Sequence, residues 1–352
     1  MRKRLTQFFA AATFLLWESL QKNITSQVKK RRVRVTVKKI VNRLLQCILT
    51  LFIVSVLCFA LTKAAPGDPV LTYVEPNMSE EYIQNLRESL GLTKPVYEQY
   101  FLWLGRIMHG NFGNSLMNNR PVLTQMLERL PATVILMGSS MVLGFLIAVV
   151  LGLYSGKNKN GILDKITSLF CYIGVSIPTF WFGIMLIYLL SVHLHILPSI
   201  GMHSDGDRSF GDLILHMIMP CAVLTFANAS QYIRYLRSST ITEMSSDYVM
   251  VQTAYGMKDS GILFHHVLKN AMLPMITVLG MSLQSLVSGA IITEQVFAWP
   301  GIGQLAVTAV MQYDYPLIMG ITMFTALLVV AGNLLADVLY AVFDPRIRKA
   351  GA

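Results

Sequence analysis

The stretch Asp247–Pro274 has the sequence DYVMVQTAYGMKDSGILFHHVLKNAMLP, a polar and partly basic segment that lies between two long apolar runs. A glycine, Gly256, stands near its middle, and the segment ends on Leu-Pro. Connections between packed helices are usually only a few residues long, so packing gives no reason for a polar connection of this length. The segment is therefore predicted to be a docking element, which another protein grips.

The composition predicts a membrane protein. Hydrophobic residues make up 54% of the 352 residues and charged residues 14%, whereas about 25% of the residues of a soluble domain are charged. The formal net charge of +10 does not indicate nucleic-acid binding, because the basic residues cluster at the edges of apolar runs, as membrane topology requires. The four cysteines lie within or at the edges of these runs and are predicted to be small buried hydrophobes: Cys47, Cys58, Cys171 and Cys221.

Six apolar runs predict an all-α polytopic fold with six transmembrane helices. Each run has the length of about 20 residues or more that a helix needs to cross a bilayer. The glycines and prolines inside them are tolerated in spans where neighbouring helices approach closely. The predicted spans are residues 41–62, 132–154, 166–192, 213–233, 274–295 and 317–340.

The lysines and arginines predict the topology. The first 43 residues hold twelve of them, and further groups lie between spans two and three, between spans four and five, and after span six. The opposite side has seven, spread over longer loops. Because Lys and Arg are enriched on the cytoplasmic side, both termini and the segment Asp247–Pro274 are predicted to be cytoplasmic.

Residues 1–40 are predicted to form a basic, amphipathic extension on the inner leaflet, because Leu5, Phe8, Ala12 and Leu15 recur at helical spacing. A seventh span or a signal peptide is the alternative. A signal peptide also begins with basic residues and an apolar core, but here no clear cleavage site follows and a second basic run begins at Lys29.

Residues 63–131 are predicted to form a sizeable extracytoplasmic loop domain. Its first part, APGDP at 65–69, enforces a turn, and residues 79–91 predict a helix with Ser79 as N-cap and Gly91 at its end. An apolar stripe follows, for which packing at the membrane interface is weighed against contact with a ligand or partner: Tyr97, Tyr100, Phe101, Trp103 and Leu104.

The sequence predicts neither catalytic residues nor a metal site. Residues 152–157 look like a phosphate loop, but the glycine spacing is wrong and Asn158 replaces the Ser or Thr that would bind magnesium. The pair His193 and His195 has no carboxylate or cysteine cluster near it in sequence. Glu294 and Asp337 lie near span ends, where an acid either has a function or reaches water.

The segment Asp247–Pro274 resembles the cytoplasmic EAA loop of permease subunits of ATP-binding-cassette (ABC) importers, most closely the peptide and nickel permeases of the first-subunit type. The similarity extends over residues 36–350, with the motifs in the expected order. The other similar stretches are PGDP at 66–69, GLTKPVYEQYFLWLGRIMHGNFGNS at 91–115, RPVLTQMLERLPAT at 120–133, SIPTFW at 176–181, LPSIGM at 197–202, LKNAMLPMITVLG at 268–280, EQVFAWPGIGQL at 294–305 and DPRIR at 344–348.

This resemblance implies a type I importer permease with a first span at 41–62, a five-helix core at 132–343 containing a coupling loop at 237–273, and a cytoplasmic tail at 344–352. Such a subunit forms half of the pathway for di- or oligopeptides or, alternatively, for nickel or a metal chelate. The implied partners are a homologous second permease, two ATPase subunits that carry ATP and Mg²⁺, an extracytoplasmic binding protein and membrane lipid. No cofactor on this chain and no nucleic-acid partner are implied.

The resemblance also places contacts with the ATPase in the coupling loop, although Gln252 and Thr253 depart from the Glu, Ala or Arg common in the class. Residues 241–256 are expected to form a short helix that Gly256 ends. A self-contained channel or secondary transporter is the alternative from another class, and it would need acids at mid-membrane, which the span centres lack. The expected coupling residues are Asp247, Tyr248, Gln252, Ala254, Gly256 and Met257.

Overall fold

The computed structural model of the chain describes residues 42–64, 93–282 and 290–343, together with Glu81, Gln84 and Glu88. These residues form helices, turns and loops, with one isolated β-bridge between Asn114 and Pro121. The chain divides into two units, Met1–Phe52 with Ala341–Ala352, and Ile53–Tyr340. Within the described residues, the first unit holds only the beginning of the helix Asn42–Ala64 and the last residues of the final helix.

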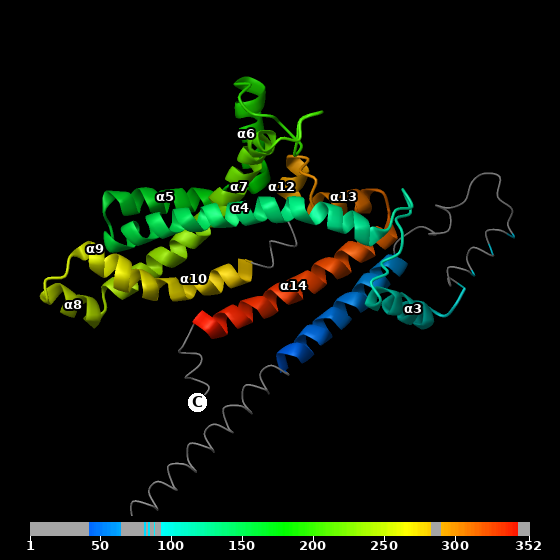
Figure 1. Cartoon of the computed structure of the whole chain (residues 1–352), viewed down its shortest axis with the longest axis horizontal. Coiled ribbons are helices and arrows are strands. Elements are labelled where there is room, and N and C mark those ends of the chain that lie inside the picture. The colour runs from blue at the N-terminus through cyan, green and yellow to red at the C-terminus, as the bar shows by residue number, and fades with distance from the viewer. Residues whose placement is uncertain are drawn as a thin grey trace, which may run out of the picture. The chain divides into compact units, whose positions relative to one another are not determined.

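Five described helices are long and apolar enough to cross a membrane, and a sixth crossing is formed if a bent helix pair counts as one span. The all-helical prediction is thus confirmed for the described residues. The helices that follow Asn42–Ala64 (Figure 1) are α3 Val96–Met108, α4 Val122–Lys157, α5 Ile162–Ser176, α6 Thr179–Leu186, η2 Ile187–His193, α7 Phe210–Met244, α8 Asp247–Ala254, α9 Asp259–Gly261, η3 Ile262–Val267, α10 Leu268–Ser282, α12 Ile291–Val296, α13 Ile302–Met311 and α14 Tyr315–Phe343.

Two predicted spans are placed differently by the structure. Span three is a pair of helices, Ile162–Ser176 and Thr179–His193, bent by 100°. The bend follows from Pro178, because a residue before proline avoids helical geometry, and Ile177 is extended with φ −79° and ψ 126°. Span five, expected at 274–295, begins earlier in the structure: the candidate span runs over Asp259–Gly280, residues 283–289 lie outside the described part, and α12 begins at Ile291.

Other predicted boundaries also change. Helix α4 begins at Val122 and contains Pro131, so its first ten residues belong to the predicted loop domain 63–131. Helix α7 covers 35 residues and continues to Met244, which makes the predicted single helix over 241–256 wrong. The predictions for residues 1–40, the turn at 65–69, the tail 344–352 and most of the helix at 79–91 lie outside the described residues.

Helices α4 and α7 pack side by side and run in the same direction. Gly144 of α4 lies against Ala229 of α7, and further along both helices Gly156 lies against Thr240. Glycine permits this close approach in membrane helices. Two parallel helices begin at the same end, so the chain between them must return, which is consistent with the bent pair being one span.

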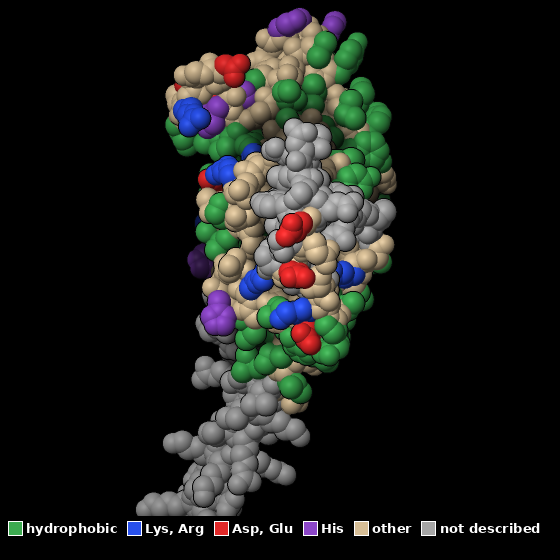
Figure 2. Space-filling view, turned by 90° about the vertical axis from the view of Figure 1, so that its right-hand side faces the viewer, with side chains coloured by type: hydrophobic (Ala, Val, Ile, Leu, Met, Phe, Trp, Pro, Cys, Tyr) green, Lys and Arg blue, Asp and Glu red, His purple; other side chains and the backbone are tan. Residues whose placement is uncertain are grey.

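Long apolar side chains outside the packed interior are exposed along the spans. On α4, for example, Val142 and Val150 are more than half exposed, and on α5 Ile166 and Leu169 are. Figure 2 shows green hydrophobic side chains along one edge of the face in view. A surface of this kind suits contact with lipid or with another membrane subunit.

A buried ion pair fixes the turn between α4 and α5 against α7. Both oxygens of the Asp164 carboxylate accept from Arg237, one of them at 2.8 Å from Nη2. The side chain of Asp164 is 4% exposed and also accepts from the backbone N–H of Asn160 at 2.8 Å. Three structural elements therefore meet at this carboxylate.

Arg237→Gln should destabilise the chain by about 3 kcal/mol, because removal of one partner leaves the Asp164 charge buried and unpaired. Lys157→Gln is the matched control: its partner Asp259 is 70% exposed at 3.0 Å, and exposed pairs contribute at most about 1 kcal/mol. Thermal unfolding of each variant in detergent checks the difference. Equal unfolding midpoints for the two variants would contradict this account.

Candidate functional site

The docking segment Asp247–Pro274 is mostly helical. Helix α7 ends at Met244, α8 covers Asp247–Ala254, and from Asp259 the chain is helical through α9, η3 and α10. Only the first part of the segment, α8 and the turn after it, therefore stands apart from a candidate span. Figure 1 shows α8 at one end of the α4, α5 and α7 helices.

The end of α8 has the hydrogen bonds of a Schellman motif. The N–H of Met257 donates to the carbonyl of Gln252 at 3.1 Å, and the N–H of Gly256 donates to the carbonyl of Thr253 at 3.0 Å. Gly256 has φ +78°, a left-handed conformation that glycine adopts without the penalty of a Cβ. The prediction that Gly256 ends the helix is confirmed.

One side of α8 anchors it to the bundle. Val249 is 6% exposed and belongs to the same apolar cluster as Ile262, Leu263 and Leu236. The hydroxyl of Tyr248 donates to Glu243 Oε2 at 2.8 Å, across the break between α7 and α8. Helix α8 is thus held to α7 and to η3 by packing as well as by a hydrogen bond.

The opposite side of α8 exposes an apolar stripe, which we call the docking face: Met250, Val251, Ala254 and Tyr255. Their spacing of three and four residues puts them on one side of the helix. Met250 is 73% exposed, Val251 52% and Tyr255 89%, and Ala254 is also exposed. An unpaired apolar stripe on a short, anchored helix is suited to contact with another protein.

The predicted coupling residues divide between these two sides. Asp247, Ala254, Gly256 and Met257 are exposed. Tyr248 and Gln252 are half-buried on the anchoring side, and Oε1 of Gln252 is buried with no hydrogen-bond partner among the described residues.

Sequence reasoning passed over Met250, Val251 and Tyr255. Their spacing within an otherwise polar segment was the available signal.

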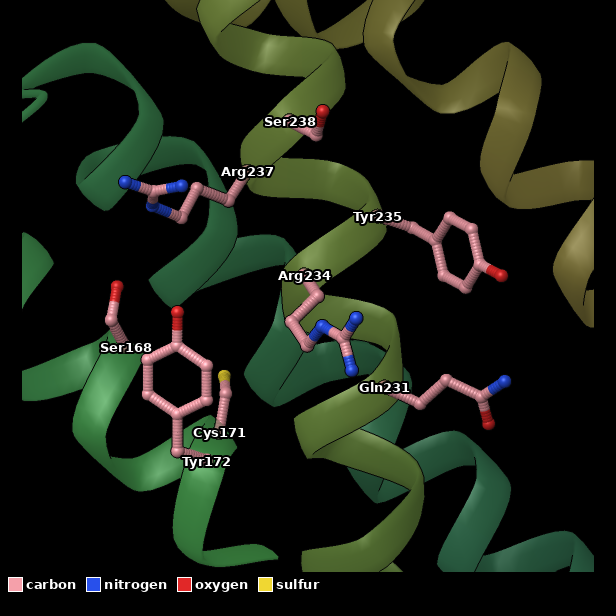
Figure 3. Close-up of a pocket in the computed structure, with 8 residues that line it drawn as sticks. All are labelled: Ser168, Cys171, Tyr172, Gln231, Arg234, Tyr235, Arg237 and Ser238. Atoms are coloured by element: carbon pink, nitrogen blue, oxygen red, sulfur yellow. The ribbon is translucent and has the colours of Figure 1, made fainter. Parts of the chain in front are cut away.

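A second candidate site is a cavity between α5 and α7 of about 440 Å³. Figure 3 shows its lining side chains coming from these two helices. Most of them are polar, and two are arginines. The lining residues are Ser168, Cys171 and Tyr172 of α5, and Gln231, Arg234, Tyr235, Arg237 and Ser238 of α7.

Glu294, one of the two acids singled out by sequence, is fully buried in α12. Its Oε1 accepts from the Thr133 hydroxyl at 2.9 Å, and its Oε2 accepts from the backbone N–H of Gln304 at 3.0 Å. Burial is the largest influence on this carboxyl and raises the pKa of Glu294, while these hydrogen bonds oppose the rise. The contacts join α12 and the start of α13 to α4, which indicates a structural role.

The remaining sequence candidates do not converge on a reactive centre. Gly152 and Gly156, which suggested a phosphate loop, lie within α4 and pack against α7. His193 ends η2 and stacks on Tyr188. Among the residues that the structure describes, no group of three or more His, Cys, Asp or Glu could hold a metal ion. The side chain of Asp337 lies outside the described part.

The apolar stripe on α3 has some side chains that pack and some that are exposed. Tyr100, Trp103 and Leu104 pack with Cys58 and Phe59 of the first span. Tyr97 and Phe101 are both 64% exposed. Three of the four cysteines, Cys58, Cys171 and Cys221, are buried as predicted, and Cys47 is half-buried.

Comparison with known proteins places this chain in a family. Residues 148–349 match the model described as "Binding-protein-dependent transport system inner membrane component", and residues 36–137 match its N-terminal companion. The oligopeptide transport system permease protein AppB of Bacillus subtilis is 40% identical over 88% of this chain and 98% of its own length. The dipeptide transport system permease protein DppB of Escherichia coli is 33% identical over 88% of this chain and 98% of its own length.

Among solved structures, a chain of the MetNI methionine ABC transporter in an inward-facing conformation has 19% identity and a TM-score of 0.47, over 65% of this chain and 97% of that chain. The family match covers more than half of the sequence, and the curated relatives are matched over nearly their whole length. The chain is therefore a multi-pass inner-membrane protein that belongs to the family of inner-membrane components of binding-protein-dependent transport systems.

Proposed function

We propose that this chain is one of two permease subunits of an ATP-driven importer and forms half of a translocation pathway for di- or oligopeptides. The observation that carries the proposal is the docking face on α8, an exposed apolar stripe on a helix that is anchored to the bundle. A second permease, two ATPase subunits and an extracytoplasmic binding protein complete the importer. ATP and Mg²⁺ bind to the ATPase subunits.

The distribution of charge supports a cytoplasmic position for the docking face. In the sequence, Lys and Arg are concentrated in the first 43 residues, between predicted spans two and three, between spans four and five, and after span six, and such clusters mark the cytoplasmic side. Lys157 ends α4, Arg237 lies about two turns before the end of α7, and Lys258 directly precedes α9. An ATPase subunit in the cytoplasm therefore reaches α8 directly.

The anchoring contacts supply the means of coupling. Closure of the ATPase subunits on ATP pushes the docking face, and α8 transmits the push because it is packed rather than free. Val249 passes it to the cluster shared with α10 and α7, and Tyr248 passes it to Glu243 at the end of α7. Packed helices move as rigid bodies between discrete arrangements, which changes access to the pathway.

The names of the relatives support a peptide as substrate, since they are an oligopeptide permease and a dipeptide permease. Nickel or a metal chelate is the alternative substrate with the same architecture. A self-contained channel or secondary transporter is the alternative of a different class, because it would need no ATPase subunits.

One experiment tests all three. The tagged chain is purified from membranes of its host, its co-purifying subunits are identified, and the complex is placed in proteoliposomes with its binding protein. We expect a second permease and two ATPases, and ATP-dependent uptake of a labelled tripeptide but not of labelled nickel. Uptake of nickel alone would favour the metal substrate, and uptake by the purified chain without ATPases would contradict the proposal.

A further inference from the structure

Two arginines line the cavity between α5 and α7, and they differ in whether an acidic side chain pairs with them. Arg237 points to α5 and is engaged with the buried Asp164 carboxylate. Arg234, one helical turn earlier, is exposed and makes no hydrogen bond or ion pair with any residue that the structure describes. Figure 3 shows Arg234 near the middle of the labelled group. The cavity thus holds one cation that the described part of the chain leaves without a counter-ion.

The same face of α7 is polar for two helical turns. Gln231, Arg234, Tyr235 and Ser238 follow one another at intervals of three, one and three residues and are all exposed, which places them on one side of the helix. The other side is buried against α4 and α10, with Leu236 fully buried. This face is not used for packing within the described chain.

A lipid acyl chain is an unsuitable neighbour for this face. Amide, hydroxyl and guanidinium groups left without hydrogen-bond partners in hydrocarbon are costly, so such residues face the bundle interior, a partner or water. The apolar side chains of α5, such as Ile166 and Leu169, provide the lipid-facing contrast, being 60% and 59% exposed. The α5–α7 cavity is therefore expected to open to water.

The chemistry of the lining selects an anion. Among the described residues no acidic side chain lines the cavity, while Arg234 presents a planar group that donates hydrogen bonds in a fork to a carboxylate. The hydroxyls of Ser168 and Tyr172, together with the Gln231 amide, can hydrogen-bond to peptide groups. The volume of about 440 Å³ falls in the usual range for small-ligand sites, about 300–1,000 Å³.

We propose that Arg234 and the polar lining of the α5–α7 cavity form a carboxylate-binding station for the C-terminus of the transported peptide. This inference rests on the proposed function. A C-terminal carboxylate is present on every unmodified peptide, so one fixed cation serves substrates of any sequence. The contact is reversible, because Arg234 is exposed and water competes for it.

A charge-selective labelling experiment tests the station. In the full importer, the four native cysteines are replaced by alanine and Gln231→Cys serves as reporter, with Ser238→Cys as the second reporter if the first does not assemble. The chain is labelled with a methanethiosulfonate carrying either a sulfonate or a trimethylammonium group. Arg234→Gln should lower the ratio of anionic to cationic labelling rates by about tenfold at low salt, because a charged cleft concentrates counter-ions.

The control reporter is Leu169→Cys, on the apolar side of α5, where Arg234→Gln should leave the ratio unchanged. An unchanged ratio at Gln231→Cys would overturn the inference, as would slower labelling there than at Leu169→Cys. The first result would show that Arg234 does not act on the cavity, and the second that the cavity is closed to water.

Competition identifies the anion. Millimolar trialanine with a free C-terminus should slow anionic labelling, trialanine amide should not, and Arg234→Gln should remove the difference. An anionic lipid phosphate is the other source of such a group. Slowing by phosphatidylglycerol nanodiscs, relative to phosphatidylcholine nanodiscs, without slowing by the free peptide would overturn the peptide assignment.

The labelling experiments do not depend on transport. The proposed function and the carboxylate-binding station can therefore be contradicted separately. If the wild-type importer takes up no peptide but the ratio of anionic to cationic labelling rates still falls in Arg234→Gln, the proposed function is contradicted. The cavity would then bind an anion, but not the C-terminus of a transported peptide. Normal peptide uptake with a ratio insensitive to Arg234→Gln would contradict the station alone.

Discussion

Ala254→Arg should abolish ATP-driven uptake while the chain still folds and inserts into the membrane. Ala254 is exposed on the docking face beside Val251 and Tyr255, so an added side chain meets nothing inside the protein. In an assembled importer the guanidinium would be buried in an apolar contact without a partner, which is strongly unfavourable. A substitution at the centre of an interface typically weakens the free energy of binding by about 2–4 kcal/mol. The affinity of the ATPase for the chain should therefore fall by about 30-fold to about 700-fold.

The measurement is recovery of the ATPase subunits with the tagged chain, together with uptake in proteoliposomes. Ser260→Arg is the matched control, because it adds the same charge at an exposed position of the same segment but outside α8. It should retain both the ATPase subunits and transport. Full retention of both by Ala254→Arg would show that the docking face does not contact the ATPase.

A companion variant changes the backbone of the site instead of its surface. Gly256→Pro fixes φ near −65° where the chain has +78°, and it removes the N–H that donates to Thr253. The turn that fixes the end of α8 should be lost, and coupling with it. Gly261→Ala is the control, because Gly261 is helical with φ −63° and an added Cβ would meet only Met257, at 3.7 Å.

The sequence predicted where α8 ends, but not which of its side chains face outward. The glycine at 256 was recognised as a helix end because the αL conformation favours that residue, a local rule. Which side of α8 faces outward depends on the neighbours of Val249, such as Leu263 and Leu236. Tyr248 and Gln252 were predicted to be contact residues, yet they lie half-buried, while Met250 and Tyr255 were missed.

Span boundaries show the same limit. The apolar run at 166–192 suggested a single helix, and only the backbone preference before Pro178 explains why it bends by 100°. The span Asp259–Gly280 is only moderately apolar, and the charged residues Lys258, Asp259 and Lys269 lie near its beginning, so the sequence did not indicate where it starts. Hydropathy finds spans by average composition, whereas their ends follow from packing that a single sequence does not reveal.

Gly301→Ala should lower the thermal stability of the folded chain markedly. Gly301 precedes α13 with an extended backbone, φ −97°, so alanine meets no backbone strain there. The conflict is in packing: an added Cβ would overlap the Glu294 carboxylate and lie 2.5 Å from Thr133 Oγ1. Both side chains are fully buried and hydrogen-bonded to each other. Overpacking costs about 1–3 kcal/mol, and the upper end is expected because neither group can move without losing its partners.

Gly105→Ala is the control for this effect, since an added Cβ at Gly105 in α3 meets nothing within 4 Å. Fluorescence-detected size exclusion after heating should show a lower unfolding midpoint for Gly301→Ala and an unchanged or higher one for Gly105→Ala, because alanine favours helices. Glu294→Ala combined with Gly301→Ala should destabilise less than the sum of the two single changes, since contacting residues do not act additively. Strict additivity would mean that the carboxylate does not restrict position 301.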